Sequence, residues 1–140
     1  MRIFSIIFLV AAMFLVPLCL EAVPPDPALL KIAQPIIDQA LEAYNAQDPV
    51  AFYKDWAESM KGVATPQVFA VMFTNMYFKH YGKYVSKEML VAECVLMEAS
   101  PVGILAYKAE FEKNKSIKIA VNVTNENGVW KLMQIQFNPM

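Results

Sequence analysis

The chain has 140 residues and carries 12 Lys plus Arg against 13 Asp plus Glu, which gives a net charge of −1. Proteins that bind nucleic acid normally present a basic, arginine-rich face, whereas Arg2 is the only arginine here. The composition therefore argues against nucleic acid as a partner.

An apolar segment at the N-terminus predicts export. Arg2 supplies one positive charge, residues 3–18 are almost wholly apolar, and Ala22 is a small residue at a suitable cleavage point. This is the layout of a secretory signal peptide over residues 1–22. We therefore expect a mature protein that is periplasmic or secreted.

Two other interpretations of this leader stay open. An uncleaved anchor needs about 20 apolar residues to cross a bilayer, and here Pro17 and Glu21 shorten the run. An anchor of this kind would be the chain's one contact with the membrane. A lipid-modified Cys19 requires a small residue before it, where this sequence has Leu18.

After cleavage, the chain has little material for metal or histidine chemistry. Cys94 is then the one remaining thiol, so no intramolecular disulfide can form, and its apolar neighbours favour burial. His80 is the only histidine, which excludes His-based triads and multi-histidine metal sites. We predict no catalytic residue, no metal and no cofactor.

The mature chain is predicted to be one domain that begins with helices. Residues 23–27, V-P-P-D-P, form a proline-rich linker, and a single α+β domain covers residues 28–140. The first helix starts near Ala28, with a kink expected at Pro35. Apolar residues at steps of three and four give it one buried face, formed by Ile32, Ile36, Ile37, Ala40, Leu41 and Tyr44.

Two further helices are predicted from the same start signal, a capping side chain followed by proline. Asp48-Pro49 opens a second helix, which we expect to run to Gly62 and to bury Phe52, Trp56 and Met60. Thr65-Pro66 opens a third helix that runs to about His80, before Gly82 ends it.

After Gly82 the apolar residues alternate with polar ones, which predicts strands. Two segments alternate clearly, at residues 105–112 and 117–124, and two more are expected at about 89–97 and 129–137. Short turns join them, so neighbouring strands are antiparallel. The predicted fold is three N-terminal helices packed on one face of a curved four-stranded antiparallel meander sheet.

This order of elements, with A-Y-N-A-Q-D-P-V-A-F-Y at residues 43–53 and G-V-W-K-L at residues 128–132, resembles the nuclear transport factor 2-like superfamily. Ketosteroid isomerase and scytalone dehydratase share that cone-like fold, and the chain looks most similar to small exported bacterial members of unassigned function. The resemblance implies a pocket between the helices and the concave sheet. Many members place a short strand between the second and third helices, where this chain has only residues 62–64.

The third helix is more apolar than a helix that covers one side of a sheet requires. It is either buried on two sides, or its extra face lines a ligand pocket or joins a second copy. The aromatic residues expected to line such a pocket are Tyr44, Trp56, Phe69, Phe73, Tyr77, Tyr107 and Phe111.

These observations favour a non-enzymatic exported domain that binds a small apolar ligand or a protein partner through an apolar pocket or face. The partner could be a second copy, in a homodimer, or another exported protein. One alternative is a small isomerase- or dehydratase-type enzyme that transfers protons in the same pocket. Another is an accessory subunit of an exported protein.

Overall fold

The computed structural model describes residues 23–140, and the predicted signal peptide, with Cys19 and Ala22, lies outside the described residues. The helical segments come first: α1 (Pro27–Asn45), α2 (Pro49–Phe52), η1 (Glu58–Met60), α3 (Pro66–Phe69), the π-helix η2 (Ala70–Phe78) and α4 (Lys79–Tyr81). The strands follow: β1 (Tyr84–Met89), β2 (Val102–Phe111), β3 (Ile117–Glu126) and β4 (Val129–Pro139), with a short helix η3 (Val91–Glu93) after β1.

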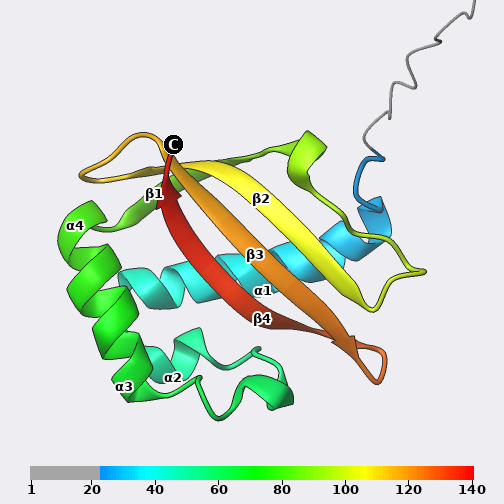
Figure 1. Cartoon of the computed structure of the whole chain (residues 1–140), viewed down its shortest axis with the longest axis horizontal. Helices are drawn as coiled ribbons and strands as arrows, with labels where there is room; N and C mark the ends of the chain where they lie inside the picture. Colours follow the sequence, from blue (N-terminus) through cyan, green and yellow to red (C-terminus); the bar gives the residue numbers. More distant parts are fainter. Residues whose placement is uncertain (1–22) are drawn as a thin grey trace, which may run out of the picture.

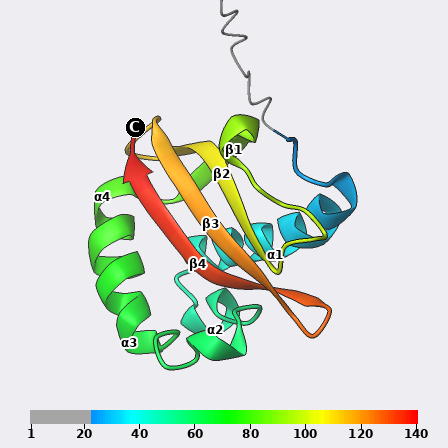
Figure 2. The same cartoon turned by 45° about the vertical axis from the view of Figure 1, so that its right-hand side comes forward.

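The predicted α+β architecture is confirmed. The four strands are antiparallel and lie in the order β1-β2-β3-β4, so the sheet is an open meander (Figure 1). Helix α1 crosses one face of the sheet, and α3, η2 and α4 stand beside the free edge of β4 (Figures 1 and 2). The inward faces of β2 and β3 alternate as expected, with Leu105, Tyr107, Ile119 and Val121 all buried.

Side-chain caps explain where the helices begin. The Asp26 carboxylate accepts a hydrogen bond from Ala28 N at 2.8 Å, and helix α1 then continues through Pro35 to Asn45. The predicted starts at Asp48-Pro49 and Thr65-Pro66 are both confirmed, because each first residue caps the helix that follows it. On α1, however, Ile32 is exposed.

The prediction that the second helix runs to Gly62 is wrong. Helix α2 ends at Phe52, because the next residues leave the helix and pair with the edge of β4. The Leu132 N–H donates to Asp55 O at 2.8 Å, and the Ala57 N–H donates to Leu132 O at 2.7 Å. Two backbone hydrogen bonds to β4 therefore form where the helix would otherwise continue.

The first strand also differs from the prediction of residues 89–97. It is β1, at Tyr84–Met89, and only the Val95–Ile104 pair continues as an isolated bridge. The strand begins early because Gly82, with φ of 74°, turns the chain directly out of α4. The Asn45 side chain then holds both the N–H and the C=O of Tyr84. The sequence of β1 does not alternate clearly between apolar and polar residues, because β1 is an edge strand with much exposed surface.

Strand β4 contains an irregularity that matters for the site. Val123 lies opposite Leu132 and Val121 lies opposite Ile135, so three steps on β4 match two on β3. The extra residue makes a β-bulge at Met133. Both Leu132 and Ile135 point into the core despite their odd spacing.

Candidate functional site

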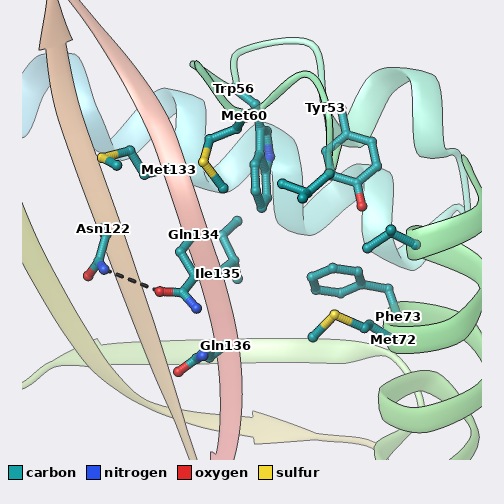
Figure 3. Close-up of a pocket in the computed structure, with 12 residues that line it drawn as sticks. Tyr53, Trp56, Met60, Met72, Phe73, Asn122, Met133, Gln134, Ile135 and Gln136 are labelled. Carbon is teal, nitrogen blue, oxygen red and sulfur yellow. Dashed lines mark hydrogen bonds between the residues drawn. The ribbon is translucent and has the colours of Figure 1, made fainter. Parts of the chain in front are cut away.

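A pocket of about 300 Å³ opens between the helical segments and the free edge of β4 (Figure 3). We call it the β4-edge pocket. One wall comes from the chain between α2 and α3, a second from α3 and η2, and the third from β3 and β4. Its lining is formed by Tyr53, Trp56, Met60, Val63, Val68, Met72, Phe73, Asn122, Met133, Gln134, Ile135 and Gln136.

The early end of α2 creates the first wall. Because the backbone on both sides of Trp56 pairs with Leu132, the Trp56 side chain is held beside β4. Its ring lies 4.9 Å from that of Tyr53 and 5.6 Å from that of Phe52, measured between centroids. The buried Phe52 ring thereby anchors both pocket aromatics to the core.

The second wall is formed where the third helix widens into a π-helix. In η2 the Lys79 N–H reaches the Thr74 C=O five residues back, and Met72 and Phe73 line the pocket from this stretch. π-Helical segments are rare and are frequent at functional sites. This wall therefore combines an uncommon backbone geometry with flexible and aromatic side chains.

The lining contains no carboxylate, imidazole or ammonium group. Its polar groups are Asn122, Gln134 and Gln136 at the sheet wall, together with the Tyr53 hydroxyl and the Trp56 indole N–H. The Asn122 amide donates to Gln134 Oε1 at 3.3 Å (Figure 3). The pocket is thus uncharged, with a few hydrogen-bonding groups on apolar walls.

Two of these groups are buried without a partner. Within residues 23–140, neither the Tyr53 hydroxyl nor the Trp56 Nε1 atom has a hydrogen-bond partner. Burial raises the pKa of Tyr53 to about 12, so its hydroxyl keeps its proton at neutral pH and stays a donor. Both atoms are therefore available to an acceptor that enters the pocket.

Of the residues expected to line a pocket, Trp56 and Phe73 do so. The others, Tyr44, Phe69, Tyr77, Tyr107 and Phe111, are buried in the core. The Tyr44 hydroxyl is already used, since it donates to Gly82 O at 2.8 Å. Aromatic rings fill the interior between the helices and the concave sheet. The centroid of the Tyr44 ring lies 5.1 to 6.4 Å from those of Phe73, Phe111 and Phe137. The Phe137 ring in turn lies 6.0 Å from that of Phe73 and 5.0 Å from that of Phe111.

Sequence reasoning missed most of the actual lining. Val68 and Met72, four residues apart on one helix, carried a usable signal. The β4 residues carried no such signal, because the bulge at Met133 depends on how β4 pairs with β3. Met60 was expected on the buried side of a longer helix and lines the pocket from η1 instead.

A second cluster of polar side chains lies between α1 and the β1–β2 end of the sheet. Lys87 forms an ion pair with Asp38, and its Nζ atom lies 5.2 Å from the ring centre of Tyr107. The Tyr107 hydroxyl has no partner among the described residues, and burial raises its pKa. The Cys94 thiol nearby is buried and donates to Leu90 O at 3.3 Å, and burial raises its pKa as well.

Residues 23–140 contain no group of three or more His, Cys, Asp or Glu side chains placed to hold a metal ion. In the same part of the chain, no helix has both the length and the apolar character needed to cross a membrane. No model of a known protein family matches the chain, and no curated protein sequence matches it either.

Proposed function

We propose that this protein binds a small, uncharged, largely apolar ligand in the β4-edge pocket and acts by binding rather than by catalysis. The observation that carries the proposal is the lining itself. Apolar and aromatic side chains surround a volume of about 300 Å³, and two buried donors beside it lack partners in the described part of the chain. Small-molecule sites commonly combine apolar walls with a few polar groups that fix orientation.

The unpaired donors favour a ligand that carries a hydrogen-bond acceptor. A buried donor without a partner costs about 1–3 kcal/mol. A carbonyl or ether oxygen that reaches Tyr53 or Trp56 would recover part of that cost, in addition to the apolar area that the ligand buries. A charged ligand would instead have to lose its hydration without gaining an opposite charge.

The same lining weighs against the isomerase or dehydratase alternative. Proton transfer needs a group that gains or loses a proton near neutral pH. The one ionisable group in the lining is Tyr53, and its pKa of about 12 keeps it protonated. The order of helices and strands supports the resemblance to the nuclear transport factor 2-like superfamily, but in this chain aromatic rings fill the space where that resemblance implies a pocket. An exported, signal-peptide-cleaved form remains part of the proposal.

Binding can be tested with N-phenyl-1-naphthylamine, an uncharged apolar probe whose fluorescence rises in apolar sites. We expect saturable binding that weakens at least about tenfold in Val68→Phe, because the larger side chain fills the pocket. Val50→Phe is the matched control, since Val50 is 79% exposed on α2 and lies outside the lining. Equal binding to both variants, or none to the wild type, contradicts the proposal.

A second candidate function is self-association through the outer side of the same helix. Val71 is 66% exposed and, with Gln67, Val68 and Met72, lines a shallow apolar groove beside the pocket. A second copy of the chain that covers this groove would form a homodimer. The mass of the protein in solution, measured by light scattering, should fall to that of a monomer in Val71→Lys. A wild-type protein that is monomeric at high concentration would exclude this candidate.

A further inference from the structure

The carboxamides and the aromatic rings of the β4-edge pocket lie on opposite sides of it. Asn122, Gln134 and Gln136 lie on the sheet side, whereas Trp56 and Phe73 lie on the helical side (Figure 3). A ligand that fills the pocket therefore meets two chemically different surfaces, one able to form hydrogen bonds and one mainly apolar.

The three carboxamides belong to the face of the sheet that points away from the core. On β4, Gln134 and Gln136 alternate with the buried residues Ile135 and Phe137, so their side chains point to the opposite face. Asn122 lies directly opposite Gln134 on β3 and shares that face. Because all three carboxamide residues line the pocket, the pocket continues around the edge of β4 onto the outer face of the sheet.

This row of carboxamides offers both donors and acceptors to a ligand. The bond from Asn122 Nδ2 to Gln134 Oε1, at 3.3 Å, leaves the Asn122 oxygen and the Gln134 nitrogen for other partners. Gln136 lies opposite Ala120, whose methyl group forms no hydrogen bond, so both ends of the Gln136 carboxamide stay available on that side. Hydroxyl groups match such a row, because each of them also donates and accepts.

Other polar groups match the row less well. A carbonyl or ether oxygen only accepts, so it leaves the Asn122 oxygen without a donor. A carboxylate likewise only accepts and an ammonium group only donates, and neither meets an opposite charge in the lining. The row therefore favours an uncharged group that carries hydroxyls.

We infer that the ligand is a neutral amphiphile, with a diol or larger polyol head group on the carboxamide row and a short apolar tail among the aromatic and methionine side chains. This deepens the proposed function and rests on it. The volume of about 300 Å³ holds roughly ten heavy atoms, at about 30 Å³ for each water-sized group. Met60 and Met72 are unbranched and adaptable, so they can pack against a flexible chain.

A matched pair of compounds tests the head group. Glycerol monohexyl ether and its di-O-methyl derivative carry the same tail, but the methylated compound cannot donate a hydrogen bond. Their affinities are measured by displacement of N-phenyl-1-naphthylamine, and the readout is the affinity of the diol divided by that of the methylated compound. Hydration of the free compounds is the same for every variant, so it cancels when these ratios are compared.

We expect the ratio to fall at least about fivefold in Gln136→Met, as the loss of one hydrogen bond implies. Asn122→Leu should lower the ratio in the same way, and it carries the test if the first variant does not fold. Asn138→Leu is the matched control, because Asn138 lies on the same face of β4 as Gln136 and outside the lining. Circular dichroism checks that each variant is folded.

The outcomes separate this inference from the proposed function. A ratio that stays constant in the folded lining variants, or that falls as much in Asn138→Leu, overturns the hydroxylated head group and leaves apolar binding standing. Failure of both compounds to displace the bound probe has the same meaning. If N-phenyl-1-naphthylamine and both compounds fail to bind, the proposed function falls and the inference falls with it.

Discussion

Two regions of this protein are built from the same kinds of side chain and differ in how their polar atoms are used. In the core, Tyr44 packs edge-on against Phe111 and Phe137, and its hydroxyl is paired with Gly82. In the β4-edge pocket, Tyr53 and Trp56 also pack edge-on, but neither polar atom has a hydrogen-bond partner among residues 23–140. Aromatic content alone therefore does not distinguish the core around Tyr44 from the pocket around Tyr53, whereas the hydrogen-bond pairing of these two hydroxyls does.

The largest expected difference between the regions is in packing. Phe111→Ala removes a fully buried ring from the core and should lower the free energy of unfolding by about 3–5 kcal/mol. Met60→Ala, in the partly open pocket, should lower it by less than half as much. Urea denaturation measures both, and similar losses would mean that the pocket is packed as tightly as the core.

The hydroxyl groups offer a sharper comparison with almost no change in volume. Tyr44→Phe leaves the buried Gly82 carbonyl without its partner and should cost about 1–3 kcal/mol of stability. Tyr53→Phe removes a donor that has no partner within the described residues, so stability should stay constant or rise by up to about 1 kcal/mol. A loss in Tyr53→Phe as large as that in Tyr44→Phe would contradict the difference between the regions.

Alkaline pH should reveal the burial of Tyr53. Its pKa is about 12 in the folded protein against an ordinary value near 10, so its contribution to stability is complete below pH 10. Between pH 10 and 12 the unfolded chain loses this proton first, and stability falls by an amount on the order of 1–2 kcal/mol. The stability difference between wild type and Tyr53→Phe, from urea denaturation, should be constant from pH 7 to 9 and shift in favour of the variant above pH 10. A difference that stays flat to pH 12 would show that Tyr53 is solvated.

The rim of the pocket should matter least for stability. Gln134 is exposed and accepts one hydrogen bond from Asn122 at 3.3 Å. Gln134→Ala should therefore change the free energy of unfolding by no more than about 0.5 kcal/mol. A loss well above 1 kcal/mol, measured by thermal and urea unfolding, would place this residue in the folded core.

Local signals in the sequence predicted much of the fold. The caps at Asp48 and Thr65 and the alternation along β2 and β3 depend on neighbouring residues, and they identified these elements correctly. The end of α2 at Phe52 could not be predicted in this way, because the competing partner, Leu132, lies far along the chain.

The candidate site depends more on distant pairing than the fold does, and it was predicted less well. Trp56 and Phe73 were identified because large aromatic residues on apolar helices are conspicuous. The sheet wall depends on the bulge at Met133, which changes the register of β4 without a glycine or proline to mark it. The unpaired state of Tyr53 is a property of its surroundings, and no sequence pattern reports it.

The interruptions along the edge of β4 also govern how this sheet can meet another one. A long exposed edge offers a continuous row of hydrogen bonds to neighbouring molecules and so favours fibril growth. Here Asp55 and Ala57 already pair with the backbone of Leu132, and Pro139 has no N–H to offer, so the row is interrupted at two points. An edge interrupted in this way is a poor template for the pairing of strands from other molecules.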